Sequence, residues 1–199
     1  KLCNAIQHAH NQGIIHRDLK PSNVLASMGE DGPKVTVIDF GIAKALEARI
    51  GDETFMTAHG HFMGTPEYMS PEQFNSDTGI DTRSDIYALG VLLYELLAGR
   101  LPYERKKIRG VNLLEVQRII QEEEPPKPST RYERLRTTQI ETMQSIAQNR
   151  RSIPQRLHKR LRGDLDWIVM KCLEKDRERR YETPNELAND LDRFLSHQP

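Results

Sequence analysis

His16–Asn23 reads HRDLKPSN, and Asp39–Gly41 reads DFG. Between these two stretches, residues 34–38 alternate β-branched and other residues in the manner of a β-strand. A third stretch, GTPEYMSPE, occupies residues 64–72. Each pattern could arise alone by chance, DFG especially. Their occurrence together in this order is hard to produce by accident, so they decide the interpretation of the whole chain.

The residue types in these stretches can accept a proton, neutralise an anion and hold a metal ion. Asp18 can accept the proton of a hydroxyl nucleophile, and Lys20 can neutralise a phosphate. Asn23 and Asp39 offer the hard oxygen ligands that Mg²⁺ prefers. Taken singly, Asp18 and Asn23 would more often be turn residues or helix caps. The three ordered stretches favour the chemical interpretation.

Together the three stretches resemble the serine/threonine protein kinase family. HRDLKPSN matches the catalytic-loop pattern H-R-D-L-x-x-x-N, DFG matches the metal-binding tripeptide, and residues 64–72 are similar to the end of an activation segment. The resemblance runs nearly from end to end and is most similar to bacterial kinases of the eukaryotic type. It implies a mainly α fold: a protein-kinase-like C-terminal lobe with a small β-hairpin at the catalytic loop.

The resemblance implies a role for each residue of the cleft. Asp18 would be the catalytic base, and Lys20 would contact the γ-phosphate of ATP. Asn23 and Asp39 would bind Mg²⁺, with Mn²⁺ as a second possible ion. Val24, Leu25 and Ala26 would form the floor beneath the adenine ring; the plainer interpretation of this run, a core strand, is compatible with that role.

Three further residues would support the cleft. The resemblance gives His16 a structural role and places Phe40 under the active site, where it would set the conformation of Asp39. An isolated phenylalanine would otherwise be a core residue. Gly41 is expected to allow the turn that aims Asp39, because glycine adopts conformations closed to other residues.

Residues 42–63 are polar and would form the activation loop. In the family, an arginine in the position of Arg17 pairs with a phosphate on this loop. Thr54 and Thr57 are the candidate phosphorylation sites, and a phosphate would add about two negative charges. The alternative, unmodified loop threonines, stays open.

The segment at residues 64–72 would hold the protein substrate beside the acceptor hydroxyl. Thr65 is similar to the residue whose hydroxyl contacts the catalytic Asp18, and with a lysine at position 20 it favours the Ser/Thr branch over the Tyr branch. Glu72 is expected to pair with Arg180. Asp85 is expected to accept hydrogen bonds from the catalytic-loop backbone; its plainer interpretation, an acid favourable at a helix N-terminus, is compatible with that role.

The chain has 199 residues and a formal net charge of zero, which suits one domain or one large lobe and gives no general attraction to nucleic acid or membranes. Its two cysteines, Cys3 and Cys172, are expected to be reduced and buried, as in the cytoplasm. No apolar run is long enough to span a membrane. A membrane anchor elsewhere in a longer parent chain is left open.

Apolar spacing and terminal signals predict the main helices. They are expected over residues 1–12, 82–97, 111–123, 164–175 and 184–195. The expected caps are Asp164 and Thr183. Residues 27–33 are expected to form the hairpin turn. His8 and His10 point to different faces of the first helix and are expected to be surface histidines.

The segment at residues 131–162 holds nine Arg or Lys and only two Glu. Such a segment suggests an acidic partner or nucleic acid, or else a solvated insert that balances acids elsewhere. The solvated insert is the favoured interpretation, and no nucleic-acid partner is expected.

No two glycines stand two residues apart, so the glycine-rich phosphate loop of a complete kinase is absent. Residues 1–199 are therefore expected to be the C-terminal lobe of a longer protein, without its small N-terminal lobe and inactive alone. The parent would be a Ser/Thr kinase with ATP and protein substrates as partners. The alternative is a non-catalytic kinase-like lobe that binds other proteins. Intact Asp18, Asn23 and Asp39 favour the enzyme.

Overall fold

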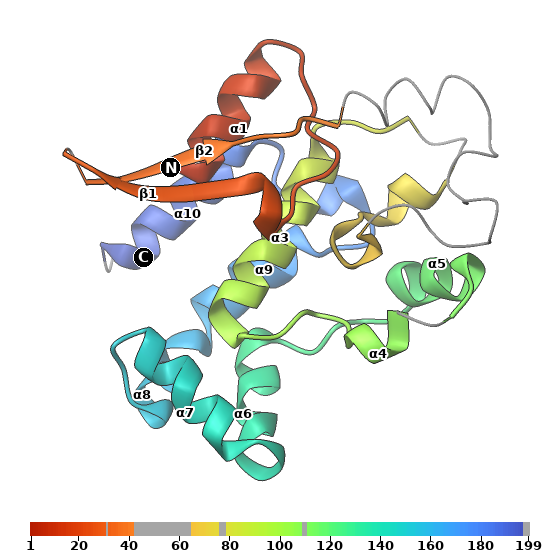
Figure 1. Ribbon diagram of the computed structural model, residues 1–199. Helices are drawn as coiled ribbons and strands as arrows, with labels where there is room; N and C mark the ends of the chain where they lie inside the picture. The colour runs from red at the N-terminus through yellow and green to blue at the C-terminus, as the bar shows by residue number, and fades with distance from the viewer. Residues whose placement is uncertain (31, 42–64, 76–78, 109–110, 197–199) are drawn as a thin grey trace.

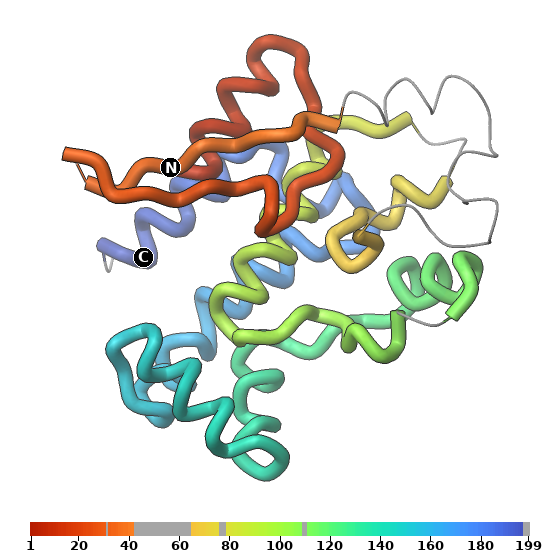
Figure 2. Tube along the Cα trace, viewed as in Figure 1, coloured from red at the N-terminus to blue at the C-terminus, as the bar shows by residue number. Residues whose placement is uncertain are grey.

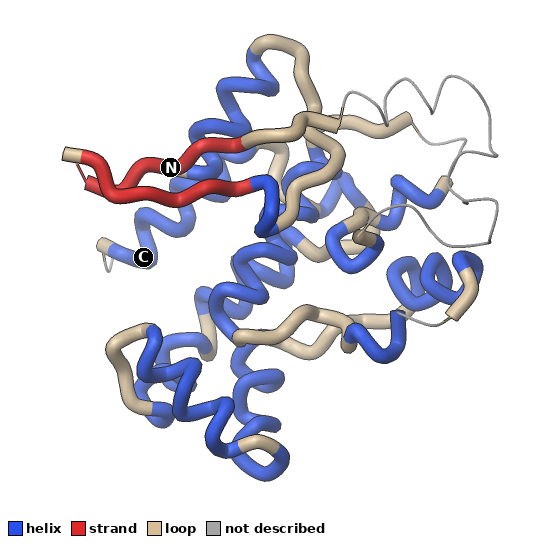
Figure 3. Tube along the Cα trace, in the orientation of Figure 1, coloured by secondary structure: helices blue, strands red, loops and turns tan. Residues whose placement is uncertain are grey.

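The computed structural model describes residues 1–30, 32–41, 65–75, 79–108 and 111–196. These residues form a mainly helical body with one two-stranded sheet, which confirms the expected fold class (Figures 1 and 3). The elements in chain order are α1 (Leu2–Asn11), η1 (Pro21–Asn23), β1 (Val24–Gly29), β2 (Gly32–Val37), η2 (Pro66–Tyr68), η3 (Pro71–Phe74), α3 (Arg83–Ala98), α4 (Arg105–Ile108), α5 (Leu113–Glu122), α6 (Pro128–Thr138), α7 (Ile140–Asn149), α8 (Pro154–Leu161), α9 (Asp164–Cys172), η4 (Arg177–Arg179) and α10 (Pro184–Leu195).

Helix α3 is the central element of the fold and passes through the middle of the molecule (Figure 2). Apolar residues nearly surround α3, and Ile86 and Tyr94 are completely buried. The helix packs on α9 within the main core. Gly90 is required at this crossing, because a Cβ there would overlap the Cβ of Cys172. The absent side chain lets the two helix backbones approach closely.

Strands β1 and β2 form an antiparallel hairpin in which Val24 lies opposite Val37 and Gly29 lies opposite Gly32. The predicted hairpin is confirmed, but its turn is shorter than the expected residues 27–33, because the strand pairing continues to Gly29 and Gly32. Gly32 has φ +99°, a backbone conformation that glycine adopts without strain. The glycine-bearing tip therefore reverses the chain in fewer residues than the composition suggested.

The ends of the chain pack together, since α1 lies against α10 and the backbone N–H of Asn185 donates to Gln7 Oε1 at 3.2 Å.

Thr183 caps α10 as predicted, because its hydroxyl accepts from the N–H of Glu186. The predicted cap and the predicted last residue of α9 are both wrong. Asp164 is the first helical residue, with Gly163 as the cap at φ +104°, and α9 ends at Cys172 rather than at residue 175.

The basic segment at residues 131–162 is a helical unit, and most of its Arg and Lys side chains are exposed to solvent. Helices α6, α7 and α8 lie together at the lower end of the molecule in Figure 1. They enclose a separate apolar core made of Tyr132, Leu135, Met143, Ile146, Ala147, Leu157, Leu161 and Leu165. Gly99, which ends α3 in a left-handed conformation, packs directly against Ile146. The unit is therefore joined to the end of the central helix.

Cys172 is buried and Cys3 is partly buried, and both are free thiols. Burial raises the pKa of both thiols. In the part of the chain that the structure describes, no helix combines the length and apolar character needed to cross a membrane.

Replacing Gly90 with alanine tests the α3–α9 crossing. Alanine favours a helix by about 1 kcal/mol over glycine, but overpacking a core typically costs roughly 1–3 kcal/mol. Because the added methyl would meet the Cβ of Cys172 rather than a flexible side-chain end, we expect the Gly90→Ala variant to be less stable in urea denaturation followed by circular dichroism. Gly79→Ala is the control, since a Cβ at Gly79 has open space around it. Equal stability of the two variants would contradict this account.

Candidate active site

Asp85 anchors the loop at residues 16–23, called here the HRD loop. The residue lies in the first turn of α3 and is 1% exposed. Its carboxylate accepts the backbone N–H of His16 at 2.8 Å and that of Arg17 at 2.9 Å. These are the hydrogen bonds expected from the sequence. The buried charge is satisfied by fixed donors, so the start of the HRD loop is held on the central helix.

His10 contributes to the same anchor, and the prediction of a surface histidine at this position is wrong. Its side chain is only 5% exposed, and its Nε2 lies 2.8 Å from the carboxylate of Asp85. The Nδ1 atom is buried and has no hydrogen-bond partner among the described residues. No local pattern in α1 distinguishes His10 from an exposed histidine, because its partner lies 75 residues away.

Two residues of the site adopt left-handed backbone conformations that are unusual outside glycine: Arg17 at φ +64° and Asp39 at φ +55°. The backbone of Arg17 is fixed on both sides, because its N–H donates to Asp85 and its carbonyl accepts from Gln73 Nε2 at 2.9 Å. Such strained residues persist where the surroundings over-determine them, and they cluster at functional sites.

Gly41 ties the DFG tripeptide to the HRD loop through its N–H, which donates to the carbonyl of His16 at 2.8 Å. A Cβ at Gly41 would also lie 2.8 Å from that oxygen. The sequence predicted that Gly41 would adopt the unusual turn conformation, but Asp39 adopts it instead. Glycine is required at position 41 because the backbone there lies so close to the His16 carbonyl.

His16 is completely buried and holds the other side of this junction. Its Nε2 lies 3.1 Å from the carbonyl of Ile38, and its ring lies against Phe40 with the centroids 4.6 Å apart. The segment that carries Asp39 is thus attached to the HRD loop by a hydrogen bond and a ring contact.

Asp18, Lys20 and Asn23 form a compact polar group at the mouth of the HRD loop. Lys20 Nζ lies 2.7 Å from Asp18 Oδ2. The amide nitrogen of Asn23 donates to the Asp18 carbonyl at 2.9 Å and to its carboxylate at 3.3 Å. Asn23 is 4% exposed, so its amide is held in one orientation with the oxygen left as an acceptor.

Leu25 on β1 is 52% exposed, although it is a large apolar residue. Ala26 is exposed too, and Val24 is partly buried. The plainer interpretation of a core strand is therefore wrong for this run. The structure leaves an apolar surface beside the polar group at residues 18–23.

Glu72 and Arg180 form the buried ion pair expected from the sequence. Arg180 Nη1 and Nη2 donate to the two carboxylate oxygens of Glu72 at 2.7 and 2.9 Å, and the Ser84 hydroxyl donates to the same carboxylate at 2.8 Å. Burial by itself would raise the pKa of Glu72, but the hydrogen bonds and charge of Arg180 outweigh burial and lower it.

Of the three threonines expected to act on this side of the site, the structure describes only Thr65. Thr54 and Thr57 lie outside the described residues. Thr65 precedes η2, and within the described part of the chain no hydrogen bond joins its hydroxyl to Asp18. The expected contact of Thr65 is therefore not formed in this structure.

Sequence reasoning missed Gln73 and Ser84. Gln73 Oε1 accepts the N–H of Ser70 at 3.0 Å, while its amide nitrogen donates to the Arg17 carbonyl. The S-x-x-Q spacing is a recognisable capping pattern and could have indicated the first of these bonds. The contact with Arg17 and that of Ser84 with Glu72 depend on long-range packing and have no local signal.

The chain was compared with known proteins. The family model described as "Protein kinase domain" matches residues 1–191. The serine/threonine-protein kinase PknB of Mycobacterium leprae (strain TN) is 36% identical over 197 residues, which cover 99% of this chain and 25% of that protein. The serine/threonine-protein kinase Pkn1 of Myxococcus xanthus is 44% identical over 133 residues, covering 66% of this chain and 18% of that protein.

Among solved structures, the PknI kinase domain of Mycobacterium tuberculosis is similar with a TM-score of 0.55 and 20% sequence identity. The match covers 97% of this chain and 52% of that chain. The chain thus spans about a quarter or less of the curated relatives described above, and about half of the solved domain.

The ion pair of Glu72 with Arg180 predicts a strong, acid-sensitive contribution to stability. We expect Arg180→Ala to cost about 3–5 kcal/mol, because it leaves the buried Glu72 carboxylate without its cation. Arg179→Ala is the control, since its side chain is 74% exposed and we expect a loss of less than about 1 kcal/mol. Similar losses for both variants in urea denaturation would refute the assignment.

The same pair also sets a pH dependence. Because folding lowers the pKa of Glu72, its contribution is present above the usual carboxyl value of 4.5 and is lost as the pH falls through the folded-state pKa. Glu72→Gln should therefore flatten the acid side of the curve of unfolding free energy against pH. An unchanged curve would show that other carboxylates carry the acid sensitivity.

Proposed function

The chain belongs to the protein kinase family, and from this premise we propose that residues 1–199 are the C-terminal lobe of a Ser/Thr protein kinase that transfers the γ-phosphate of ATP to proteins. The observation that carries the proposal is the arrangement of Asp18, Lys20 and Asn23, with the Lys20 ammonium 2.7 Å from the Asp18 carboxylate and the Asn23 amide fixed beside it. A lobe that only bound proteins would not need this arrangement.

Asp18 acts as the base. The hydroxyl oxygen of a substrate Ser or Thr bonds to the γ-phosphorus as the bond from that phosphorus to the β–γ bridging oxygen breaks, and ADP leaves. The hydroxyl proton passes to the Asp18 carboxylate. Lys20 places its positive charge beside both the base and the transferred phosphoryl group, where negative charge spreads in the transition state.

Asn23 and Asp39 would hold Mg²⁺, or Mn²⁺ in its place. Their donor set fits such an ion: the Asn23 amide nitrogen is committed to Asp18, which leaves its hard oxygen, and Asp39 carries an exposed carboxylate at the end of the hairpin. When bound, the metal would neutralise phosphate charge. The phosphates of ATP would thus be surrounded by Lys20, Asn23 and Asp39. The adenine ring would lie on the exposed Leu25.

The protein substrate would be held by the segment at residues 65–72, and Arg17 would take part in activation. Within the described residues no carboxylate pairs with the Arg17 guanidinium, so a phosphate on Thr54 or Thr57 would give it an anionic partner. Thr65 would reach Asp18 in the phosphorylated enzyme, and Lys20 with Thr65 favours the Ser/Thr branch. Glu72 and Arg180 hold this segment on the lobe.

A nucleotide-binding small lobe must be joined to this chain for turnover, because kinases hold ATP between two lobes. We place the kinase domain in the cytoplasm, with ATP and protein substrates as partners. Any membrane anchor would lie outside this chain. The second candidate function is a lobe that only binds proteins. The two candidates differ in one expected result: only the enzyme has a metal-dependent phosphate transfer that is lost when Asp18 or Asp39 is replaced.

Substitution of the proposed base tests the mechanism in the full-length kinase. We expect Asp18→Asn to lower kcat by roughly 10²–10⁴-fold, the usual contribution of a general base. Asp39→Ala should remove the Mg²⁺-dependent activity. Asp164→Asn is the control, because its carboxylate is exposed on α9. Transfer is measured with labelled ATP, and the products should be phosphoserine and phosphothreonine.

Two results would overturn this assignment. One is full activity of Asp18→Asn; the other is a product dominated by phosphotyrosine. The 199-residue chain alone should transfer no measurable phosphate, since half of the nucleotide contacts would be missing.

The role of Arg17 predicts activation by phosphorylation. We expect the full-length kinase to autophosphorylate at Thr57, Thr54 or both, and the modification to raise activity through charge-assisted hydrogen bonds to Arg17. Arg17→Ala should abolish the activation while ATP binding survives. Mass spectrometry and activity of a Thr54→Ala/Thr57→Ala variant test this. Full activity of that variant, with no phosphate on the loop of the wild type, would contradict the proposal.

A further inference from the structure

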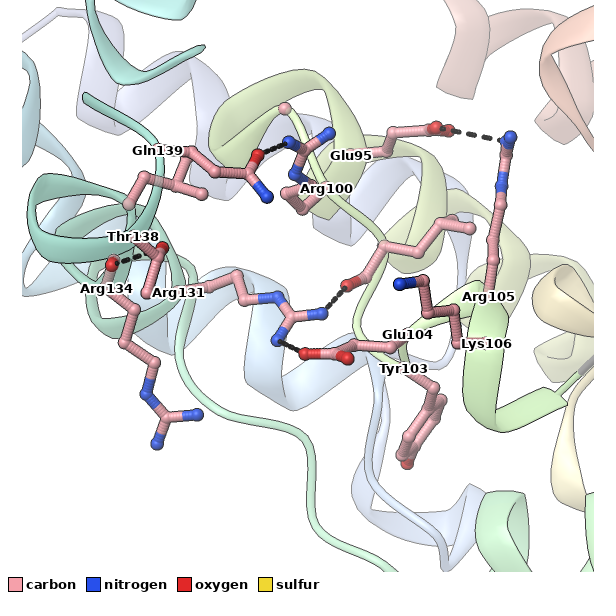
Figure 4. Close-up of a pocket in the computed structure, with 13 residues that line it drawn as sticks. Glu95, Arg100, Tyr103, Glu104, Arg105, Lys106, Arg131, Arg134, Thr138 and Gln139 are labelled. Atoms are coloured by element: carbon pink, nitrogen blue, oxygen red, sulfur yellow. Dashed lines mark hydrogen bonds and ion pairs between the residues drawn. The ribbon is translucent and has the colours of Figure 1, made fainter. Parts of the chain in front are cut away.

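A cavity of about 570 Å³ lies between the end of α3, the loop that leads to α4, and helix α6 (Figure 4). One wall carries Arg100, Arg105 and Lys106, and the other carries Arg131 and Arg134. Its size is that of a ligand pocket, and it lies outside the polar group formed by residues 18–23. The basic helical unit thus contributes side chains to a concave site rather than only to a solvated face.

The cavity has an excess of positive charge. Five cationic side chains line it, against the carboxylates of Glu95 and Glu104. Both acids are already engaged: Glu104 accepts from Arg131 at 3.0 Å, and Glu95 accepts the hydroxyl of Tyr68 at 2.5 Å. Within the described residues neither Lys106 nor Arg134 pairs with a carboxylate. An anionic ligand would supply the missing negative charge.

Arg131 spans the cavity and is held in place. Its side chain is 12% exposed, and Figure 4 shows its guanidinium directed toward Glu104. Its Nη2 also donates to the carbonyl of Leu101 at 3.5 Å. Its Nε is buried and has no hydrogen-bond partner among the described residues. A planar guanidinium with a donor in excess is suited to carboxylate or phosphate oxygens.

The cavity is connected to the segment that would hold the protein substrate. Tyr68 lies in η2, inside that segment, and its hydroxyl reaches Glu95 at the rim of the cavity. Arg105 lies 3.9 Å from the other oxygen of Glu95. A polypeptide lying along η2 would therefore reach the basic lining without leaving the surface of the lobe.

We propose that this cavity binds an acidic segment, rich in Asp and Glu, of the protein substrate, and that it thereby selects substrates; this inference rests on the proposed kinase function. A peptide suits the site better than nucleic acid for two reasons. The chain has a net charge of zero, which gives no extended field for a phosphate backbone. The cavity, of about 570 Å³, also has room for a few acidic side chains rather than for a continuous polyanion.

Binding to the full-length kinase tests the inference directly, with fluorescence anisotropy of a labelled Glu/Asp-rich peptide. The Lys106→Gln/Arg134→Gln variant removes two exposed cations of the cavity, and Lys159→Gln/Arg160→Gln removes two exposed cations of α8 outside it. We expect the dissociation constant to rise about tenfold in the first variant and less than about twofold in the second. A Gln/Asn peptide of equal length should bind more weakly than the acidic peptide.

Turnover separates this inference from the proposed function. With the wild type, kcat/KM should favour a serine peptide bearing the acidic segment over one bearing the Gln/Asn segment, and the cavity variant should reduce that ratio toward one. Equal binding by the cavity and α8 variants, or stronger displacement by a single-stranded oligonucleotide than by an acidic peptide of equal charge, would overturn the inference. Transfer to neither peptide, with charge-dependent binding intact, would refute the kinase function and leave an acidic-peptide site.

Discussion

The carboxylate of Asp85 is the constraint on which the arrangement of the site depends. A carboxylate that is 1% exposed must be compensated by hydrogen bonds, and here the donors are two backbone N–H groups of the HRD loop and the ring of His10. Because Asp85 lies on α3, which is buried on nearly all sides, the hydrogen bonds to Asp85 fix the start of the HRD loop to the core. The left-handed conformation of Arg17 is tolerated for the same reason.

The first turn of α3 also holds the segment at residues 65–72. Ser84 donates to Glu72, and Arg180 donates both to Glu72 and to the carbonyl of Arg83. Two buried carboxylates, from residues 72 and 85, are therefore compensated around one helical turn. This placement connects the HRD loop to the segment at residues 65–72 through α3, so that the positions of both are fixed by the same helix.

Particular residues mark the limit of sequence-based prediction. The mainly α fold, the cap of α10, the Asp85 anchor and the pair of Glu72 with Arg180 were all predicted. The burial of His10 was not, because its partner lies on another helix. The left-handed turn was placed at Gly41 rather than at Asp39, since glycine is the usual choice for such a conformation.

The sequence alone determined the family, because HRDLKPSN and DFG place an acid, a cation, an amide and a second acid at the spacings of the family's patterns. It also determined the central helix, whose apolar residues nearly surround it. Only the tertiary structure decided what the basic segment at residues 131–162 is. Its composition described a charged surface, while its scattered apolar residues form a core only when three helices pack together. That packing brings Arg131 and Arg134 opposite the end of α3 and creates a basic cavity, because side chains distant in sequence gain a common position only through folding.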